Sequence, residues 1–252
     1  LPLLISVDIK AEDEGRIFGG RYATPGEFPW MVIIKWDETI ICSGFLISEN
    51  YVLTAAHCIF LPVHNITGKI GTIDVDHGQN ITFESATVNP NFYYYTFYGD
   101  IALLKLTQPV TFNENVKKIC LAFNSSFYEP NTPVLQMGWG GFLNGSTKYS
   151  KILKVTDVGK ILETKTCANY PIAYPHGSVC VKNYGNDGVC EGDSGGPLVV
   201  KKGNRYTAIG ADSFGFYANC TVDNSFAEIF PDLFYHRQWI LDVTNGDICK
   251  NY

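Results

Sequence analysis

Short runs of strand-forming residues, separated by turn residues, recur along most of this chain. Clear examples are Trp30–Lys35, Ala86–Asn89, Thr132–Met137 and Pro197–Val200. Runs rich in Val, Ile, Tyr and Phe between such turns favour many short strands over helices. With 252 residues, 46% of them apolar, the chain can bury one large core or two small ones. The sequence therefore predicts an all-β protein.

The last segment departs from the β pattern. Its apolar residues have helical spacing: Leu233, Phe234, Ile240 and Leu241. Pro231 or Asp232 could begin a helix there, and Asn245-Gly246 could end it. We therefore expect one C-terminal amphipathic helix over about 231–243, packed on the β body.

Eight cysteines are widely spaced and none forms a CxxC pair: Cys42, Cys58, Cys120, Cys167, Cys180, Cys190, Cys220 and Cys249. An even number at such spacing is typical of four disulfides formed in an oxidising compartment. Five glycosylation sequons agree with this: Asn65, Asn80, Asn124, Asn144 and Asn219. We expect a secreted, extracellular glycoprotein, with Asn219 the weakest sequon because Cys220 lies inside it.

The balance of charge makes several partners unexpected. The formal net charge is −6 and the pI is near 5.3. No basic stripe stands out, and the pair Lys201-Lys202 is interpreted as a solvated turn, so a nucleic-acid or heparin partner is not expected. No apolar stretch approaches the roughly 18 residues of a membrane span. Leu1–Ile5 is apolar but too short for a signal peptide, and we expect the chain to begin after signal removal.

Three segments carry candidate chemistry. Thr54-Ala-Ala-His-Cys58 contains His57, Gly99-Asp-Ile-Ala-Leu-Leu104 contains Asp100, and Gly192-Asp-Ser-Gly-Gly-Pro197 contains Ser194. A serine hydroxyl is a weak nucleophile that needs a base, and a histidine can take and return its proton. A buried carboxylate can fix the histidine tautomer and stabilise the imidazolium. The glycines leave backbone N–H groups of Gly192 and Ser194 free to form an oxyanion hole.

In these segments and several others the sequence resembles the chymotrypsin-like (trypsin-fold) serine proteases. The resemblance runs from Ile17 to about Leu241, and its motifs occur in the family's order: Ile17-Phe-Gly-Gly20, Phe28-Pro-Trp30, Cys42-Ser-Gly-Phe-Leu46, TAAHC, GDIALLKL, Gly138-Trp-Gly140, GDSGGP and Gln238-Trp-Ile240. It implies two six-stranded antiparallel β-barrels, about 17–122 and 123–230, followed by a helix and tail over 231–252. It also implies that Asp100 orients His57.

The resemblance implies three disulfides: Cys42–Cys58, Cys167–Cys180 and Cys190–Cys220. Cys120 and Cys249 remain. In some relatives a cysteine near Cys120 tethers a light chain, but residues 1–16 contain no cysteine. We predict the bond Cys120–Cys249; the alternative is that both pair with another chain.

Residues 1–16 differ from the rest, since Lys10-Ala-Glu-Asp-Glu-Gly-Arg16 is charged and lacks a strand pattern. We interpret them as an exposed, cleavable activation segment. By resemblance, a trypsin-like protease would cut between Arg16 and Ile17, and the new ammonium of Ile17 would pair with Asp193. The alternative is a leftover tail without a regulatory role.

The primary pocket is assigned by resemblance. Gly188 stands where trypsin-like enzymes have an aspartate, and Ser213-Phe-Gly215 matches the wall strand that pairs with substrate. Ser225 would lie on the opposite wall. These residues predict a neutral pocket for aromatic or large apolar side chains. Asp212 complicates this, because a buried carboxylate in the wall needs a partner or a raised pKa. It could instead select basic substrates, and a blocked or very narrow pocket is the third possibility.

Six aromatic residues crowd into the segment Phe92–Tyr98, which we call the aromatic segment. By resemblance this loop borders the subsites beside the primary pocket, with Phe97 at the second and Phe214 at outer ones. The rings would favour apolar substrate residues. The alternative is that some of them only pack the loop against the barrel.

The favoured function is a secreted serine endopeptidase. Its expected partners are protein or peptide substrates, an activating protease and protease inhibitors. We expect a monomer that needs no cofactor or metal; Asp74, Asp76 and Glu84 do not match the glutamate pair of calcium-binding relatives. One alternative is a catalytically restricted or inactive homologue that binds or regulates, suggested by departures at Ser43 and Ala227. A serine esterase of another fold is disfavoured by the order His, Asp, Ser.

Overall fold

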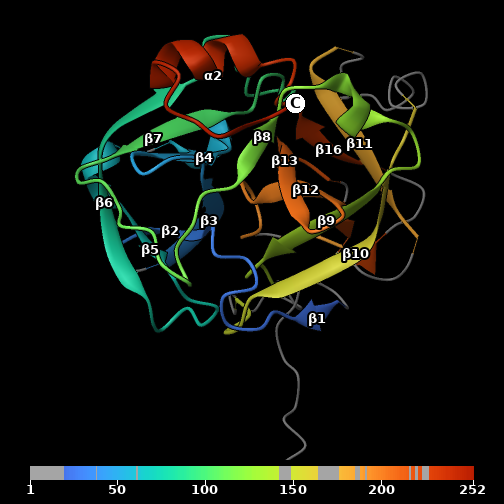
Figure 1. Ribbon diagram of the computed structural model, residues 1–252. Helices are drawn as coiled ribbons and strands as arrows, with labels where there is room; N and C mark the ends of the chain where they lie inside the picture. Colours follow the sequence, from blue (N-terminus) through green and yellow to red (C-terminus); the bar gives the residue numbers. More distant parts are fainter. Residues whose placement is uncertain are drawn as a thin grey trace, which may run out of the picture.

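The structure is a computed structural model, and it describes residues 20–37, 39–60, 62–141, 149–163, 176–184, 188–190, 192–215, 217–218, 221–222 and 227–252. Figure 1 shows two β bodies side by side. The first half of the chain, blue to green, forms one body, and the second half, yellow to orange, forms the other.

Six antiparallel strands close into the first barrel in the order β2-β3-β4-β7-β6-β5. The strands are β2 (Met31–Trp36), β3 (Thr39–Leu46), β4 (Tyr51–Thr54), β5 (Ile66–Ile70), β6 (Gln79–Val88) and β7 (Ala102–Leu106). Alternation along β2 sends Val32 and Ile34 into one apolar cluster and Met31 and Ile33 into another. The second cluster includes Trp139 and Val199 of the other body, so it joins the two.

The second body is a strongly curved sheet whose central strands run in the order β16-β11-β10-β9-β12-β13. These are β9 (Pro133–Gly138), β10 (Lys154–Ile161), β11 (Ser178–Asn183), β12 (Pro197–Lys202), β13 (Arg205–Ala211) and β16 (Glu228–Pro231). A bridge between Gly210 and Asp232 brings the two ends of this run together. The expected all-β fold with two barrels is therefore confirmed.

Short elements complete the fold. They are β1 (Arg21–Tyr22), β8 (Cys120–Ala122), β14 (Tyr217–Ala218), β15 (Thr221–Val222), β17 (Lys250–Asn251) and the 3-10 turns η1 (Ala56–Cys58), η2 (Val63–Asn65) and η3 (Ser125–Tyr128). Strand β17 lies parallel to β8. The disulfide Cys120–Cys249 joins the two strands, linking residues 129 apart in sequence.

The C-terminal helix begins later than the sequence indicates. Helix α2 spans Arg237–Thr244, whereas Pro231 is the last residue of β16 and pairs with Ser178. Asp232 does not begin the helix either: its carboxylate accepts the backbone N–H groups of Phe234 and Tyr235, which forms a turn. The C-terminal end of α2 agrees better with the prediction, since Asn245 has the left-handed conformation common after a helix.

Among the residues that the structure describes, no helix is long and apolar enough to cross a membrane.

Candidate active site

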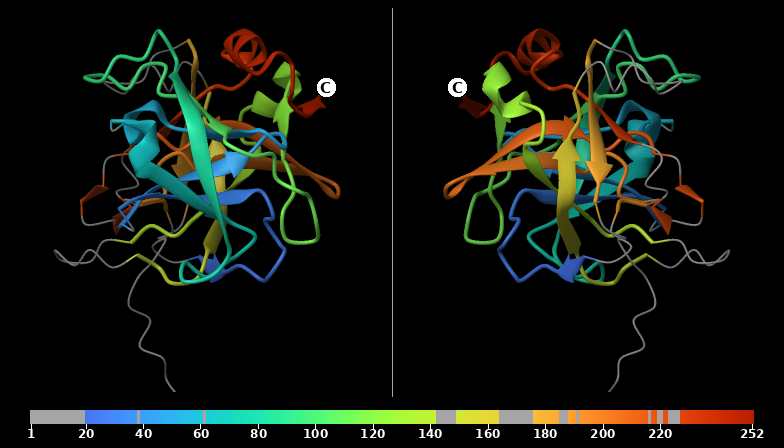
Figure 2. Two further views of the ribbon diagram at one scale, coloured as in Figure 1. Left: turned by 90° about the vertical axis from the view of Figure 1, so that its left-hand side faces the viewer. Right: turned by 90° about the vertical axis from the view of Figure 1, so that its right-hand side faces the viewer.

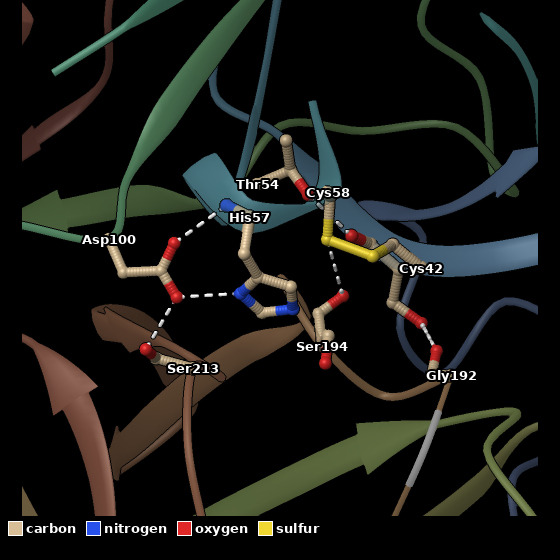
Figure 3. The surroundings of a disulfide bond; sticks show 9 residues. Cys42, Thr54, His57, Cys58, Asp100, Gly192, Ser194 and Ser213 are labelled. Carbon is tan, nitrogen blue, oxygen red and sulfur yellow. Dashed lines mark hydrogen bonds and ion pairs between the residues drawn. A yellow bond between two sulfur atoms is a disulfide. The ribbon is translucent and has the colours of Figure 1, made fainter. Parts of the chain in front are cut away.

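The three candidate catalytic residues come from different parts of the chain and meet between the two bodies. His57 lies in η1 after β4, Asp100 immediately precedes β7, and Ser194 lies in the loop before β12. Figure 3 shows the imidazole of His57 between Asp100 and Ser194.

Asp100 is fully buried and accepts three hydrogen bonds. Its Oδ1 accepts the backbone N–H of His57 at 2.8 Å, and its Oδ2 lies 2.7 Å from His57 Nδ1. Ser213 donates its hydroxyl to the same Oδ2 at 2.5 Å. These donors hold the carboxylate in one orientation. It favours the tautomer with a proton on Nδ1, which leaves Nε2 as an acceptor on the other side of the ring.

The disulfide Cys42–Cys58 lies directly beside His57, with an S–S distance of 1.96 Å. The donor atoms of Cys42, His57 and Cys58 all lie within 4.8 Å of one another, a spacing at which such residues can hold a metal ion. Both sulfurs are used in the disulfide, so the thiolate ligands that a metal needs are absent. Among the described residues this cluster is the one metal candidate, and its chemistry fits a structural cross-link.

The nucleophile loop is shaped by two glycines in the left-handed region. Gly192 has φ 93°, and a Cβ there would meet the ring of Tyr149 at 2.8 Å. Gly195 has φ 81°, and its Cβ would lie 2.2 Å from Thr54 Oγ1. Only glycine fits either position without moving its neighbours. The sequence assigns Gly192 to the oxyanion hole. Its left-handed backbone conformation is one that glycine adopts without strain.

Ser43 contacts the same loop from the first barrel. Its side chain is fully buried and donates to the carbonyl of Gly192 at 3.0 Å. Its backbone N–H donates to the carbonyl of Ser194 at 2.8 Å. The sequence identifies Ser43 as a departure from the family pattern. The structure shows that it holds Gly192 and Ser194 in place.

Asp193 is fully buried behind the loop. Its carboxylate accepts the N–H of Gly140 at 2.7 Å and that of Cys190 at 2.8 Å. Burial nevertheless raises the pKa of Asp193 to about 7, because two neutral donors do not replace full hydration. No cation faces it among the described residues. Arg16 and Ile17, the predicted activation residues, lie outside the described part of the chain.

The structure describes part of the segment that is predicted to form the wall of the primary pocket. Phe214 and Ile229 exchange backbone hydrogen bonds of 3.2 and 2.7 Å, which joins the wall segment to β16. Gly188 is buried and Gly215 is half-buried. Ser225, assigned to the opposite wall, lies outside the described residues.

Asp212 supports the nucleophile loop through its backbone. Its N–H donates to Gly196 O and its carbonyl accepts from Gly195 N, both at 2.7 Å. Burial, and then the nearby negative charge of Glu228, raises the pKa of the Asp212 carboxyl well above its ordinary value. Both effects disfavour the charged form of this carboxyl.

Glu228 is a buried acid of this region that the sequence interpretation missed. It is 5% exposed and accepts hydrogen bonds from the side-chain amides of Gln136 and, at 2.9 Å, Asn183. It stands in β16 next to Ile229, which pairs with the wall residue Phe214. A signal was present: Gln136 interrupts the otherwise apolar run Val134–Met137, and such a buried amide needs a polar partner.

The aromatic segment reaches the catalytic residues through Phe97. The ring of Phe97 meets the His57 ring edge-on at 5.5 Å and lies 5.2 Å from the ring of Phe214. Its backbone has φ 54°, an uncommon conformation for an aromatic residue that marks a constrained position. Farther out, Tyr95 is 80% exposed, so part of the segment does not pack against the barrel.

The remaining cysteines and sequons are only partly described. Cys180 and Cys190 are disulfide-bonded, while their predicted partners Cys167 and Cys220 lie outside the described residues. Asn80 and Asn124 are exposed and Asn65 is half-buried. The sequons at Asn144 and Asn219 are outside the described part.

Comparison with known proteins agrees with this geometry. A family model described as Trypsin matches residues 17–240. Brachyurin of Leptuca pugilator is 31% identical over 238 residues, covering 90% of this chain and 98% of brachyurin. The clotting factor G beta subunit of Tachypleus tridentatus is 29% identical over 252 residues, covering 92% of this chain and 80% of that protein. Transmembrane protease serine 11C of Mus musculus is 30% identical over 237 residues, covering 91% and 54% respectively.

The chain therefore belongs to the trypsin family. It is a serine protease, a hydrolase whose substrates are proteins.

Proposed function

We propose that the chain is a serine endopeptidase in which Ser194 attacks the peptide carbonyl, His57 acts as base and then acid, and Asp100 orients His57. The observation that carries this proposal is the buried carboxylate of Asp100, bound at once by His57 and Ser213. Nε2 of His57 would take the proton of Ser194 Oγ during attack and return it to the leaving amine. A water molecule then attacks in the same way, again with His57 as base and then acid, and the carboxylic acid part of the substrate is released.

The negative oxygen that forms on the substrate carbonyl needs donors. The N–H groups of Gly192 and Ser194 would supply them, in the family's manner. The support is the left-handed backbone of Gly192 and the hydrogen bonds from Ser43 that hold both residues. A loop fixed in advance stabilises the transition state without reorganising during the reaction.

We infer that the protein is made as a precursor activated between Arg16 and Ile17. The support is Asp193, a buried carboxyl whose pKa is raised by burial and which faces no compensating cation among the described residues. The new ammonium of Ile17 would provide that cation. A buried ion pair of this kind separates two states well, because either partner alone is unfavourable in the interior.

For specificity we propose cleavage after aromatic or large apolar residues. Gly188 places no charge in the pocket, and burial raises the pKa of Asp212, which disfavours a negative charge there. The rings of Phe97 and Phe214 would favour apolar residues upstream of the cleaved bond. Selection of basic residues through Asp212 is the alternative, and it would require this carboxyl to ionise when such a substrate binds.

Secretion is also a proposal. Disulfide-bonded cysteines at Cys42, Cys58, Cys120 and Cys249 and exposed sequons support an extracellular protein. We propose a monomer without a metal or cofactor, whose partners are protein substrates, an activating protease and protein inhibitors.

The test is hydrolysis of matched peptides. The purified chain would be cut with trypsin, freed of trypsin, and shown by N-terminal sequencing to start at Ile17. Peptides that differ only in having Phe, Leu, Ala, Arg or Asp before the scissile bond would then be compared. We expect cleavage after Phe and Leu, abolished by Ser194→Ala. Cleavage after Arg alone, lost in Asp212→Asn, would contradict the neutral pocket. No turnover despite the Ile17 start would contradict the endopeptidase and favour a binding homologue.

A further inference from the structure

Three lysines from three strands line up across the outer face of the second barrel. Lys182 of β11 is directly opposite Lys160 of β10, and Lys160 is opposite Pro133 of β9. In the antiparallel pairing of β12 with β9, Val199 is opposite Leu135. Two residues further along each strand, the same register places Lys201 opposite Pro133. Residues directly opposite one another point to the same face of a sheet. We call Lys182, Lys160 and Lys201 the lysine row.

The lysine row is accessible. It crosses four neighbouring strands, which lie about 4.8 Å apart in a sheet. Lys160 and Lys201 are exposed and Lys182 is half-buried. The right-hand view of Figure 2 faces this side of the molecule, with β10 in yellow across it.

None of the three ammonium groups is paired with a carboxylate of the described residues. Each lies over a tyrosine ring instead. Lys160 and Lys182 are 5.4 and 5.9 Å from the centre of the Tyr184 ring, and Lys201 is 4.9 Å from that of Tyr206. Tyr184 lies at the β11 end of the row and Tyr206 is opposite Lys201 at the other end. The rings hold the charges in position and leave them unneutralised.

A groove runs beside Lys201. It has a volume of about 510 Å³, and Pro133, Leu135 and Tyr206 are among the residues that line it. Two acids, Glu27 and Asp157, also line it, but Arg21 binds Glu27 and lies near enough to Asp157 to attract it. The lysine row therefore leaves this face positive on a protein whose net charge is −6.

We propose that the lysine row binds a linear sulfated polysaccharide, at a site separate from the catalytic residues. Unpaired cations in one row across the strands match a chain that carries fixed negative charges along its length, and binding would release the counterions of that chain. Apolar ring faces at both ends add contact area for a sugar. The site does not depend on the proposed proteolysis.

The test is binding of the full chain to heparin of uniform length. We expect retention on immobilised heparin in 50 mM NaCl and release as the salt rises. The triple variant Lys160→Gln, Lys182→Gln and Lys201→Gln should bind at least about tenfold more weakly. The matched control replaces Lys105, Lys117 and Lys118 of the first barrel by Gln, which gives the same net charge. It should bind as the native chain does.

Five outcomes would overturn the proposal. The native chain could fail to bind heparin, or both triple variants could lose binding equally, which would mean diffuse attraction. Heparin stripped of sulfate could bind as well as heparin. A glutamate-rich peptide could bind where heparin does not, or heparin could bind only after Glu12, Asp13 and Glu14 are changed to Gln. Either result would assign the row to an acidic protein segment. Circular dichroism of each variant would establish that it is folded.

Discussion

The interiors of the two barrels differ in kind. The cluster inside the first barrel is wholly apolar, built from residues such as Val32, Leu46 and Ile70. The second barrel holds Gln136, Asn183 and Glu228 in a buried polar group, with the carboxyls of Asp193 and Asp212 close by. Among the described buried residues, Asp100 is the one carboxylate contributed by the first barrel.

The two barrels therefore contribute different groups to the site. The first barrel provides a rigid apolar support for a single carboxylate whose hydrogen bonds are complete. The second barrel provides the nucleophile loop and several buried acids. The charged forms of these acids are not fully stabilised by hydrogen bonds or nearby cations of the described residues. Such groups are costly to bury and persist where surrounding structure or a ligand compensates them. Four experiments test this comparison.

The largest expected effect is on turnover in Asp100→Asn. The amide would hold His57 in the wrong tautomer, and we expect kcat to fall about 10⁴-fold in the activated enzyme with little change in stability. Asp212→Asn is the matched control, because Asp212 supports the nucleophile loop through its backbone and these contacts would remain. Equal losses in both variants would show that the two acids do not differ as described.

Glu228→Leu tests the polar group of the second barrel. The change would leave the amides of Gln136 and Asn183 without their acceptor, and we expect a loss of about 3–5 kcal/mol in the free energy of unfolding. Glu228→Gln should lose less, about 1–2 kcal/mol. In the first barrel, Ile34→Val should cost only about 1 kcal/mol. Urea unfolding measures all three, and a Leu variant as stable as the native chain would contradict the structural role of Glu228.

A third experiment concerns His236, which joins the C-terminal turn to the base of the aromatic segment. Its Nδ1 lies 3.1 Å from the amide of Asn89, and burial lowers the pKa of His236 to about 4. As the pH falls, the unfolded chain binds this proton first. The contribution is therefore complete above about pH 6.5 and declines by about 3 kcal/mol as the pH falls towards 4.

Urea unfolding as a function of pH measures this contribution. In His236→Gln the corresponding part of the pH dependence should be absent, while His77→Gln, at an exposed site, should keep it. An unchanged slope in His236→Gln would mean that the pKa of His236 is the same in the native and the unfolded states.

The smallest expected effect is that of Ser43→Ala. The variant loses the hydrogen bond from Ser43 to the carbonyl of Gly192, worth about 1 kcal/mol, so kcat should fall about fivefold while KM stays constant. Thr82→Val removes a hydroxyl contact on the first barrel's surface and serves as the control. A change in KM alone would assign Ser43 to substrate binding.

Local patterns in the sequence predicted much of the fold. Short β-type runs correspond to strands, as in Trp30–Lys35 for β2 and Thr132–Met137 for β9. The pairing Cys120–Cys249, predicted for the two cysteines that the family's three disulfides leave over, is present. The start of α2 was wrong because Pro231 can end a strand as well as begin a helix, and only the pairing with Ser178 decides between them.

Features that depend on strand register were not predictable. The acceptor role of Glu228 depends on β16 lying where the amides of Gln136 and Asn183 can reach it. The lysine row likewise exists because three strands are aligned at particular residues. The raised pKa of Asp212 follows from its burial, which the sequence does not give. In each case distant residues meet through a geometry that the sequence does not encode locally.

The most direct test of the central claim is covalent labelling with a fluorophosphonate, which reacts with a serine only when a neighbouring base activates it. The chain would be cut after Arg16, labelled, digested and examined by mass spectrometry. We predict one adduct, on Ser194, with labelling slowed strongly in Asp100→Asn. An activated chain that starts at Ile17 and carries no adduct on Ser194 would contradict the account.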